Sequence, residues 1–533
     1  MSETRQHLAL TRGRTKRVDV PEHASCYQAV RQRDHRFDGR FYTAVLTTGI
    51  FCRPSCPART PAAANVQFYP HPAAATEAGF RPCRRCRPEL APGHQEWNRR
   101  GDLTGKALKL IDDGVVERDG VNGMAASLGV SERHLLRELT ATLGTGPLQL
   151  ALARRLALAR VLLDQTHLTI TDIAFASGFG SVRQFNDSFR KTYHTAPSEL
   201  RQRPARRRSG ARGLSNTASA RDQTSKPGAD GESTTLVVSV RLPSRGPLRW
   251  ATISEFLAAR AIPGLERPEE DGFVRNWGQG WVKLAGLDDD DGLEVTCSLG
   301  SVSELADVLQ TARTVTDLDT DIEQIEADLG QHRLLAQRLA NYSLPRLPGA
   351  FDRFEIVMRA VVCQQISVAA ARTHLGRLVA LACDPSSDSE SSAGSVDTKI
   401  DSSPTRRFGH FPTPAQVADA PLDKLGMPQR RRETIRVLAE AMANGSIVIR
   451  PDTNPDELRQ RLVELPGIGP WTAGYIAMRA LPDPDGWPVA DLVLRRSLQV
   501  SASEMNELAN SWRPWRAYAA LLIWRSKIQE SSR

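Results

Sequence analysis

Apolar residues recur at helical spacing over most of the chain, and strand-like alternation is confined to one stretch. The run LQLALARRLALARVLL at residues 148–163 repeats with a period near 3.6 residues and predicts one long helix. By contrast, TLVVSVRL at residues 235–242 alternates valine with polar side chains, which is typical of a half-buried strand. WVKLAGL and LEVTCSL, at residues 281–287 and 293–299, predict further strands. The pattern therefore predicts a mainly helical chain with a small α+β part.

Two stretches lack any apolar period. Residues 204–233 begin with RPARRRSGAR and continue with serine, glycine and aspartate, which predicts a flexible linker. The arginine run is interpreted as a solvated tether rather than as an arm that grips phosphates. Residues 384–404 stand between two helical patterns and predict a loop insertion that extends to about residue 408.

The composition is that of a globular protein rather than a disordered, secreted or membrane protein. Hydrophobic residues make up 40% of the 533 residues, and the longest apolar runs are too short to cross a bilayer. The N-terminal segment MSETRQHLALTRGRTKR has no apolar stretch after its charges, unlike a secretory signal. We therefore expect a soluble, cytoplasmic, monomeric protein with no membrane partner. The formal net charge of +9 is compatible with nucleic acid but is weak support for it alone.

Four of the eight cysteines form two pairs, Cys52-x3-Cys56 and Cys83-x2-Cys86. Sparse, clustered cysteines indicate a metal site in a reducing compartment and not a disulfide framework. Paired thiolates on two short turns can close a tetrahedral site for one Zn²⁺ ion. Composition alone favours a purely structural zinc knot.

The sequence around these pairs, TTGIFCRPSCPART and AGFRPCRRCRPE, closely resembles the zinc domain of Ada-type alkylation-response proteins. The resemblance implies that all four thiolates bind zinc and that Cys52 accepts a methyl group from a DNA methylphosphotriester. Methylation turns a thiolate into a thioether and removes negative charge, so repulsion from DNA phosphates falls. Nearby arginines are expected to grip the DNA backbone, although each one alone is an ordinary solvated side chain. They are Arg53, Arg81, Arg84, Arg85 and Arg87.

Residues 123–144 and 170–200 each predict a short helix, a glycine turn and a second helix with an N-cap serine. This pattern is weak alone, because any small helical domain can show it. The second unit, AFASGFGSVRQFNDSFRKTYHTAPSELR, strongly resembles AraC-type regulators. The resemblance implies two recognition helices, Glu132–Leu143 and Val182–Tyr193, in successive major-groove segments of double-stranded DNA.

Side chains that point outward near the start of each recognition helix are candidates for reading base edges. They are Arg133, His134, Arg137, Arg183, Gln184 and Asn186. The neighbouring apolar side chains are expected to pack in the core. They are Leu135, Leu136, Leu139, Phe185 and Phe189.

The motif LPGIGPWTAGYIAMRAL places Gly467, Ile468 and Gly469 between two helical patterns. Such a hairpin can present backbone N–H groups to a DNA phosphate, but an ordinary αα-hairpin explains it equally well. Asp491 follows in PVADLVLRR, where a lone aspartate is usually a cap or a surface residue. Together with AVVCQQISVAAAR and SWRPWRAYAALLIW, these motifs resemble the helix-hairpin-helix DNA glycosylases of the AlkA 3-methyladenine type.

The AlkA-type resemblance implies that Asp491 is the catalytic carboxylate. Trp471, Tyr475 and Trp524 match an aromatic pocket for an electron-poor base, with core packing as the alternative, above all for Trp524. Trp471 stands where bifunctional lyases carry a lysine, so no Schiff base forms there and we expect a monofunctional glycosylase. No cysteine follows Cys383, so the iron–sulfur cluster of some relatives is not expected.

Two positions depart from the AlkA-type pattern. At the place of the wedge that fills the gap in the DNA helix, the chain has Gln365 with Ile366 beside it. A glutamine would fill the gap by hydrogen bonding, where an apolar wedge would stack. The aromatic residue that follows the catalytic aspartate in relatives is Leu492 here, which alters the pocket.

The chain is therefore predicted to be a mainly α, multidomain fusion with a small α+β zinc domain, an α+β subdomain and an all-α helix-hairpin-helix core. The expected boundaries are 1–97 for the zinc domain, 98–203 for the AraC-type reader, 204–233 for the linker, 234–312 for the α+β subdomain and 313–533 for the glycosylase. No PCHR-type motif of a second Ada methyltransferase occurs. We expect alkylpurine excision combined with methyl-triggered transcription regulation. The alternative is a regulator whose glycosylase half is weak or inactive.

Overall fold

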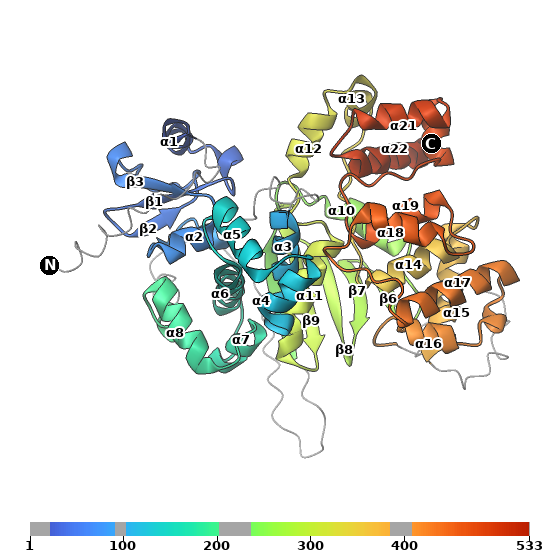
Figure 1. The fold of residues 1–533 in the computed structure, drawn as a ribbon, viewed down its shortest axis with the longest axis horizontal. Helices are drawn as coiled ribbons and strands as arrows, with labels where there is room; N and C mark the ends of the chain where they lie inside the picture. The colour runs from blue at the N-terminus through green and yellow to red at the C-terminus, as the bar shows by residue number, and fades with distance from the viewer. Residues whose placement is uncertain (1–21, 91–102, 202–235, 384–407, 532–533) are drawn as a thin grey trace, which may run out of the picture. The chain divides into compact units, whose positions relative to one another are not determined.

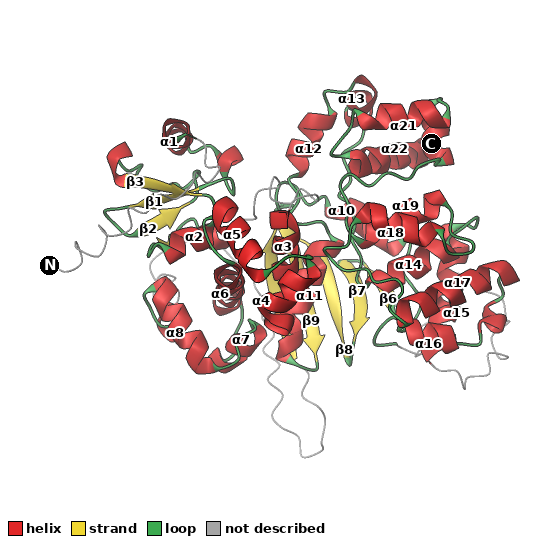
Figure 2. Cartoon of the chain, viewed as in Figure 1, coloured by secondary structure: helices red, strands yellow, loops and turns green. Residues whose placement is uncertain are grey.

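The computed structural model describes residues 22–90, 103–201, 236–383 and 408–531. The predicted linker 204–233 and most of the predicted insertion lie outside these residues. Contacts divide the chain into two compact units, with the first ending near residue 212 and the second containing the C-terminal half. Figures 1 and 2 show that helices predominate and that the strands form two separate sheets, as the sequence predicts. No helix in the described ranges is long and apolar enough to cross a membrane.

The first unit begins with a small sheet in the order β3-β1-β2-β4. β2 pairs antiparallel with β1 and parallel with β4, so the chain segments that carry the two cysteine pairs lie side by side. Tyr42, Phe51 and Phe80 form a small core beneath the sheet. The elements are α1 (His23–Gln32), β1 (Tyr42–Val45), β2 (Ile50–Cys52), β3 (Val66–Tyr69), α2 (Pro72–Glu77) and β4 (Arg81–Pro82).

Helices make up the rest of the first unit, and both predicted recognition helices have the expected bounds. The Ser131 hydroxyl accepts from the His134 N–H and the Ser181 hydroxyl accepts from the Gln184 N–H, so both predicted N-caps are confirmed. Gly120 kinks α4, because its φ of 69° is left-handed. The helices are α3 (Leu103–Asp112), α4 (Val115–Ser127), α5 (Glu132–Leu143), α6 (Pro147–Gln165), α7 (Ile170–Ala176) and α8 (Val182–Tyr193).

Within this unit the cysteine-bearing part is attached to the helices at two points. Before β4, Ala73 packs in the helical core and the Thr145 hydroxyl donates to the Glu77 carboxylate. After the second cysteine pair, Arg87 makes a 2.9 Å ion pair with Asp164 near the end of α6. The segment that holds Cys83 and Cys86 is therefore tied to the helical bundle at both ends.

The second unit opens with an antiparallel five-stranded sheet in the order β5-β9-β8-β7-β6. The sequence pattern predicts β5, β8 and β9 but not β6 and β7. β6 is a polar edge strand, and the alternation of β7 is interrupted by the buried Arg275. The elements are β5 (Leu236–Pro243), α10 (Trp250–Ala258), β6 (Glu266–Glu269), β7 (Gly272–Trp277), β8 (Gly280–Gly286), β9 (Gly292–Leu299) and α11 (Leu305–Val315).

The remaining helices pack around two apolar cores, and Tyr475 contacts both of them. They are α12 (Ile322–Leu329), α13 (Arg333–Leu339), α14 (Arg353–Val362), α15 (Val368–Cys383), α16 (Pro414–Asp419), α17 (Gln429–Ala443), α18 (Pro455–Val463), α19 (Pro470–Ala480), α20 (Leu492–Leu498), α21 (Ala502–Asn510) and α22 (Arg516–Ser531).

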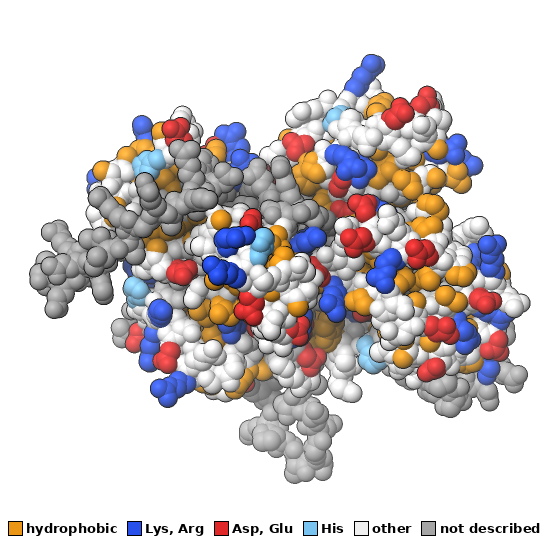
Figure 3. Space-filling view, viewed as in Figure 1, with side chains coloured by type: hydrophobic (Ala, Val, Ile, Leu, Met, Phe, Trp, Pro, Cys, Tyr) orange, Lys and Arg blue, Asp and Glu red, His pale blue; other side chains and the backbone are white. Residues whose placement is uncertain are grey.

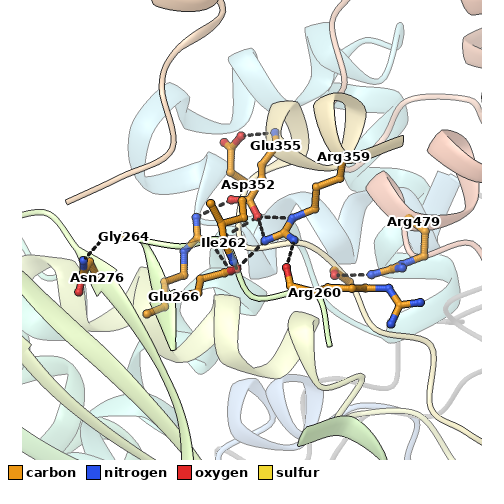
Figure 4. Close-up of polar contacts among 11 residues, drawn as sticks. Arg260, Ile262, Gly264, Glu266, Asn276, Asp352, Glu355, Arg359 and Arg479 are labelled. Atoms are coloured by element: carbon orange, nitrogen blue, oxygen red, sulfur yellow. Dashed lines mark hydrogen bonds and ion pairs between the residues drawn. The ribbon is translucent and has the colours of Figure 1, made fainter. Parts of the chain in front are cut away.

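A buried ion-pair network joins the five-stranded sheet to α14 (Figure 4). Arg275 of β7 lies 2.5 Å from both Glu266 and Glu355, and Arg359 lies 2.6 Å from Glu266 and 2.7 Å from Glu355. All four side chains are largely withdrawn from water. Burial alone would lower the pKa of Arg359, but the two glutamates raise it above its usual value.

Glu355→Gln is expected to destabilise the second unit by about 3–5 kcal/mol, because it leaves buried guanidinium charge uncompensated. Chemical denaturation followed by tryptophan fluorescence measures the change. Glu269→Gln, which removes a partly exposed partner of Arg267 and Lys283, should cost less than about 1 kcal/mol. Equal losses in the two variants would contradict a special role for the buried network.

Candidate functional site

The four predicted thiols converge at the edge of the small sheet. Their sulfur atoms all lie within 4.8 Å of one another. Cys52 ends β2, and the backbone N–H of Cys83 donates to the Phe51 carbonyl at 2.9 Å, so strand pairing brings the two cysteine pairs together. Cys83 and Cys86 are buried, whereas Cys52 is only half-buried. Cys52 is thus less enclosed than Cys83 or Cys86.

The donor set fits one Zn²⁺ ion. All four cysteines are free thiols. Sharing of hydrogen bonds with Cys56 and with the other two thiols, together with burial, raises the pKa of Cys52, so four ionised sulfurs need a bound cation. Zinc accepts four tetrahedral thiolates and, when bound, keeps them deprotonated.

Two of the arginines near the cluster are engaged by carboxylates of the protein. Arg53 pairs with Asp38 at 3.5 Å, and Asp38 also accepts from the Ser55 hydroxyl at 2.5 Å, which orders the turn between Cys52 and Cys56. Arg87 is engaged by Asp164. Arg84 and Arg85 are exposed. Two of the five arginines predicted to bind phosphate, Arg53 and Arg87, are therefore paired with carboxylates of the protein itself.

The two predicted recognition helices expose most of the residues proposed to read bases. Arg133, His134 and Arg137 are exposed on α5, and Figure 3 shows basic and histidine side chains gathered over this helix. On α8, Arg183 and Gln184 are exposed and Asn186 is half-buried.

The core predictions for these helices hold with one exception. Leu135, Leu139, Phe185 and Phe189 are fully buried, as predicted. Leu136 is half exposed, so its assignment to the core was wrong. It lies one position beyond Leu135, which turns it away from the buried face of the helix.

In the second unit, Asp491 is buried and caps α20, with its Oδ1 accepting from the Leu494 N–H at 2.7 Å. Two indole N–H groups also reach this carboxylate: Trp471 Nε1 donates to Oδ2 at 2.7 Å and Trp524 Nε1 donates to Oδ1 at 3.2 Å. Three donors therefore fix the orientation of the carboxylate.

The three predicted pocket aromatics are neighbours. Trp471 and Tyr475 stack with their ring centroids 5.5 Å apart and their planes 10° from parallel, and Trp524 lies 6.4 Å from Tyr475. All three are half-buried. Each can combine packing with an open ring face. Leu492, directly after Asp491, is 58% exposed at the start of α20.

The LPGIG hairpin connects α18 to α19. Gly467 has a left-handed φ of 83°, and a Cβ there would lie 2.1 Å from the Thr434 hydroxyl oxygen, so glycine is required for two reasons. Ile468 is buried in the core and anchors the turn. Within the described residues, the N–H groups of Gly467 and Gly469 have no acceptor. They are free to bind an oxyanion.

The two predicted wedge residues have different environments. Gln365 is exposed and has a left-handed φ of 58°, whereas Ile366 packs against the core. Gln364, which the sequence does not single out, donates to the Thr472 hydroxyl at 2.9 Å and to the Gly467 carbonyl at 3.3 Å. It joins the wedge turn to the hairpin. The sequence offered one indication of a role for Gln364, namely its position next to the predicted wedge residue Gln365.

Three family models match separate parts of the chain. They are the metal binding domain of Ada at residues 25–89, a helix-turn-helix domain at 124–203 and the AlkA N-terminal domain at 239–352. These domains define a fusion of a metal-thiolate module and a helix-turn-helix module with an AlkA-type domain.

Several curated proteins are similar to the chain. A probable bifunctional transcriptional activator/DNA repair enzyme AlkA of Mycobacterium tuberculosis is 41% identical over 510 residues, which cover 94% of this chain and 95% of the relative. DNA-3-methyladenine glycosylase 2 of Escherichia coli is 30% identical over 52% of this chain and 94% of its own length. The bifunctional transcriptional activator/DNA repair enzyme Ada of Escherichia coli is 42% identical over 23% of this chain and 33% of its own length.

The chain belongs to the family of bifunctional transcriptional activator/DNA repair enzymes that join Ada-type and AlkA-type domains. The three resemblances stated from the motifs, to Ada-type, helix-turn-helix and AlkA-type domains, are confirmed. Among solved structures, a 3-methyladenine DNA glycosylase from Archaeoglobus fulgidus is 18% identical, with a TM-score of 0.43 over 53% of this chain and 96% of that chain.

Proposed function

We propose that the chain repairs alkylated double-stranded DNA and couples this repair to transcription regulation. The second unit hydrolyses the N-glycosidic bond of alkylated purines, and the first takes up methyl groups from DNA methylphosphotriesters. The observation that carries the enzymatic half is the buried Asp491 carboxylate, held by the indole N–H groups of Trp471 and Trp524 beside the Tyr475 ring. Arginines that only bind the DNA backbone would not produce a buried carboxylate held by two indole N–H groups.

Excision requires the damaged nucleotide to leave the duplex, at a cost of a few kcal/mol of unstacking. Gln365 would fill the gap and the free N–H groups of the hairpin would hold a neighbouring phosphate. The base would lie against Trp471 and Tyr475, whose faces attract a cationic purine. As the bond from the sugar to the base breaks, Asp491 stabilises the positive charge on the sugar and orients the attacking water. The product is an abasic site, because the chain has no amine at position 471 to form a Schiff base.

Methyl uptake would take place at Cys52. Among the four cysteines, Cys52 is half-buried, whereas Cys83 and Cys86 are buried. The methyl carbon forms a bond to the Cys52 sulfur as its bond to the phosphotriester oxygen breaks, and the electron pair leaves with the phosphodiester. DNA regains a negative phosphate and the protein loses one thiolate charge, so attraction between them rises.

Incubation of the purified chain with methylated duplex DNA tests both halves in one sample. We expect free 3-methyladenine in solution and a protein mass gain of one methyl group. Free base without mass gain would leave only the glycosylase. Mass gain without free base would support the alternative, a methylation-activated regulator with an inactive glycosylase half.

Asp164→Asn is expected to weaken the coupling between methyl uptake and DNA binding, because it breaks the contact of Arg87 with α6. Methylation should raise the affinity of the wild-type protein for a duplex of fixed sequence, and couplings of this kind are typically about 5–150-fold. In the variant, the ratio of the DNA affinities of methylated and unmethylated protein should fall toward one while methyl uptake continues. Fluorescence anisotropy with both forms of the protein measures these affinities. Asp119→Asn, at an exposed position of α4, should keep the full gain.

A further inference from the structure

A buried guanidinium without a carboxylate partner lies behind the proposed base pocket. Arg479 is 4% exposed, and its side chain donates to the Tyr475 hydroxyl at 2.9 Å and to the Pro348 carbonyl at 2.7 Å, with a longer contact to the Gly349 carbonyl. No carboxylate of the described chain forms an ion pair with it. Neutral oxygens satisfy its hydrogen bonds but leave its charge uncompensated.

A second guanidinium without a carboxylate partner lies close to the first. Arg260, just after α10, lies 3.9 Å from the centroid of the Phe256 ring, and Arg479 lies 4.9 Å from the same centroid. Among the described residues, the Arg260 side chain makes one hydrogen bond, to the Phe256 carbonyl at 3.3 Å. Burial lowers the pKa of Arg260, as expected for a cation without a counter-ion. Figure 4 shows the two arginines approaching each other from different elements.

The neighbouring ion-pair network differs from these two arginines in its charge balance. Arg275 and Arg359, which hold the sheet against α14, are each paired with two glutamates. In that network, the charge of each arginine is therefore matched. Arg260 and Arg479 instead both lie against the Phe256 ring, so two positive charges are close together.

These charges lie at one end of a continuous line of contacts that has Asp491 at the other end. Arg479 donates to Tyr475, Tyr475 stacks on Trp471, and Trp471 donates to Asp491. The proposed base pocket is therefore built between a positive pole and a negative one. At effective dielectric constants near 20, unit charges several ångströms away still interact by more than the thermal energy.

We infer that Arg260 and Arg479 determine lesion specificity by favouring bases that depart as anions, an inference that rests on the proposed glycosylase function. When the glycosidic bond breaks, its electron pair goes to the base, the water oxygen bonds to the sugar carbon, and the water proton is released. An uncharged purine then carries negative charge, which the positive pole stabilises. A cationic alkylpurine is repelled by this pole while it is bound, which opposes the attraction of the aromatic faces. It departs as a neutral base, so the pole does not stabilise it in the transition state.

The test compares two lesions in the full-length protein. Single-turnover kinetics are measured on duplexes that contain 7-methylguanine, which is cationic, or hypoxanthine, which is uncharged. In Arg260→Met the ratio of kcat/KM for 7-methylguanine to that for hypoxanthine should rise at least about tenfold. The hypoxanthine reaction should slow and the KM for 7-methylguanine should fall. Arg260→Lys, which keeps the charge, should restore most of the wild-type ratio.

Arg267→Met, at an exposed arginine of β6, is the matched control and should leave the ratio unchanged. A parallel loss on both lesions in Arg260→Met would indicate a packing role and overturn the inference. Failure of the wild-type protein to release hypoxanthine while it releases 7-methylguanine would overturn it as well. Release of neither base would refute the proposed glycosylase function itself. This outcome is distinct from those that overturn only the specificity inference.

Discussion

Asp491→Asn is expected to abolish measurable release of 3-methyladenine, with a loss of at least about 100-fold, while binding to damaged duplex DNA persists. The amide is neutral and cannot stabilise positive charge on the sugar. It also keeps only one acceptor oxygen, so the donors from Leu494, Trp471 and Trp524 can no longer all be satisfied. Release of free base is followed by chromatography, and binding by fluorescence anisotropy on the same duplex.

Asparagine is also a good N-cap, so α20 should form in this variant and the protein should remain folded. Asp321→Asn is the matched control, because Asp321 caps α12 and accepts from the Gln324 N–H far from the pocket aromatics in sequence. Full release is expected there. Unchanged release in Asp491→Asn would remove Asp491 from the reaction and leave the aromatic cluster without a catalytic role.

Cys52→Ala should prevent methyl uptake from phosphotriester-containing DNA. The substitution removes the thiol of the half-buried residue Cys52, whereas Cys83 and Cys86 are buried. Intact-protein mass spectrometry after incubation with methylated DNA measures the gain of one methyl group in the wild type and its loss in the variant. Cys363→Ala changes an exposed thiol outside the cluster and should keep full uptake.

Loss of one sulfur also weakens the metal site, so a folding defect has to be separated from loss of the acceptor. Peptide mapping of the methylated wild-type protein provides that separation. The methyl group should be found on the peptide that contains Cys52. Its presence on Cys56, Cys83 or Cys86 would show that a different thiol is the acceptor, whatever the behaviour of the variant.

Local features of the chain could be predicted because their causes lie within a few residues. Ser131 and Ser181 cap helices because a hydroxyl reaches an N–H three positions along the chain. Gly467 belongs to a turn that needs a positive φ. The cysteine spacing of the two pairs is also a local pattern, and recognisable motifs around it made the family evident.

Other features depend on partners that are far apart in the sequence. β7 was missed because Arg275 is buried in it, and part of the counter-charge that stabilises this burial comes from Glu355, which lies far away in the sequence on α14. Leu136 was misplaced because helical periodicity does not say how wide the covered face of α5 is.

The sequence by itself determined the kind of protein and the residue types at its two reactive centres, since these are carried by short motifs. Only the tertiary structure decided that Asp491 receives two indole N–H groups, that Cys52 is more open than Cys83 or Cys86, and that Arg260 joins Arg479 behind Tyr475. Charge, burial and hydrogen bonding at a site depend on distances between remote segments, and packing alone sets those distances.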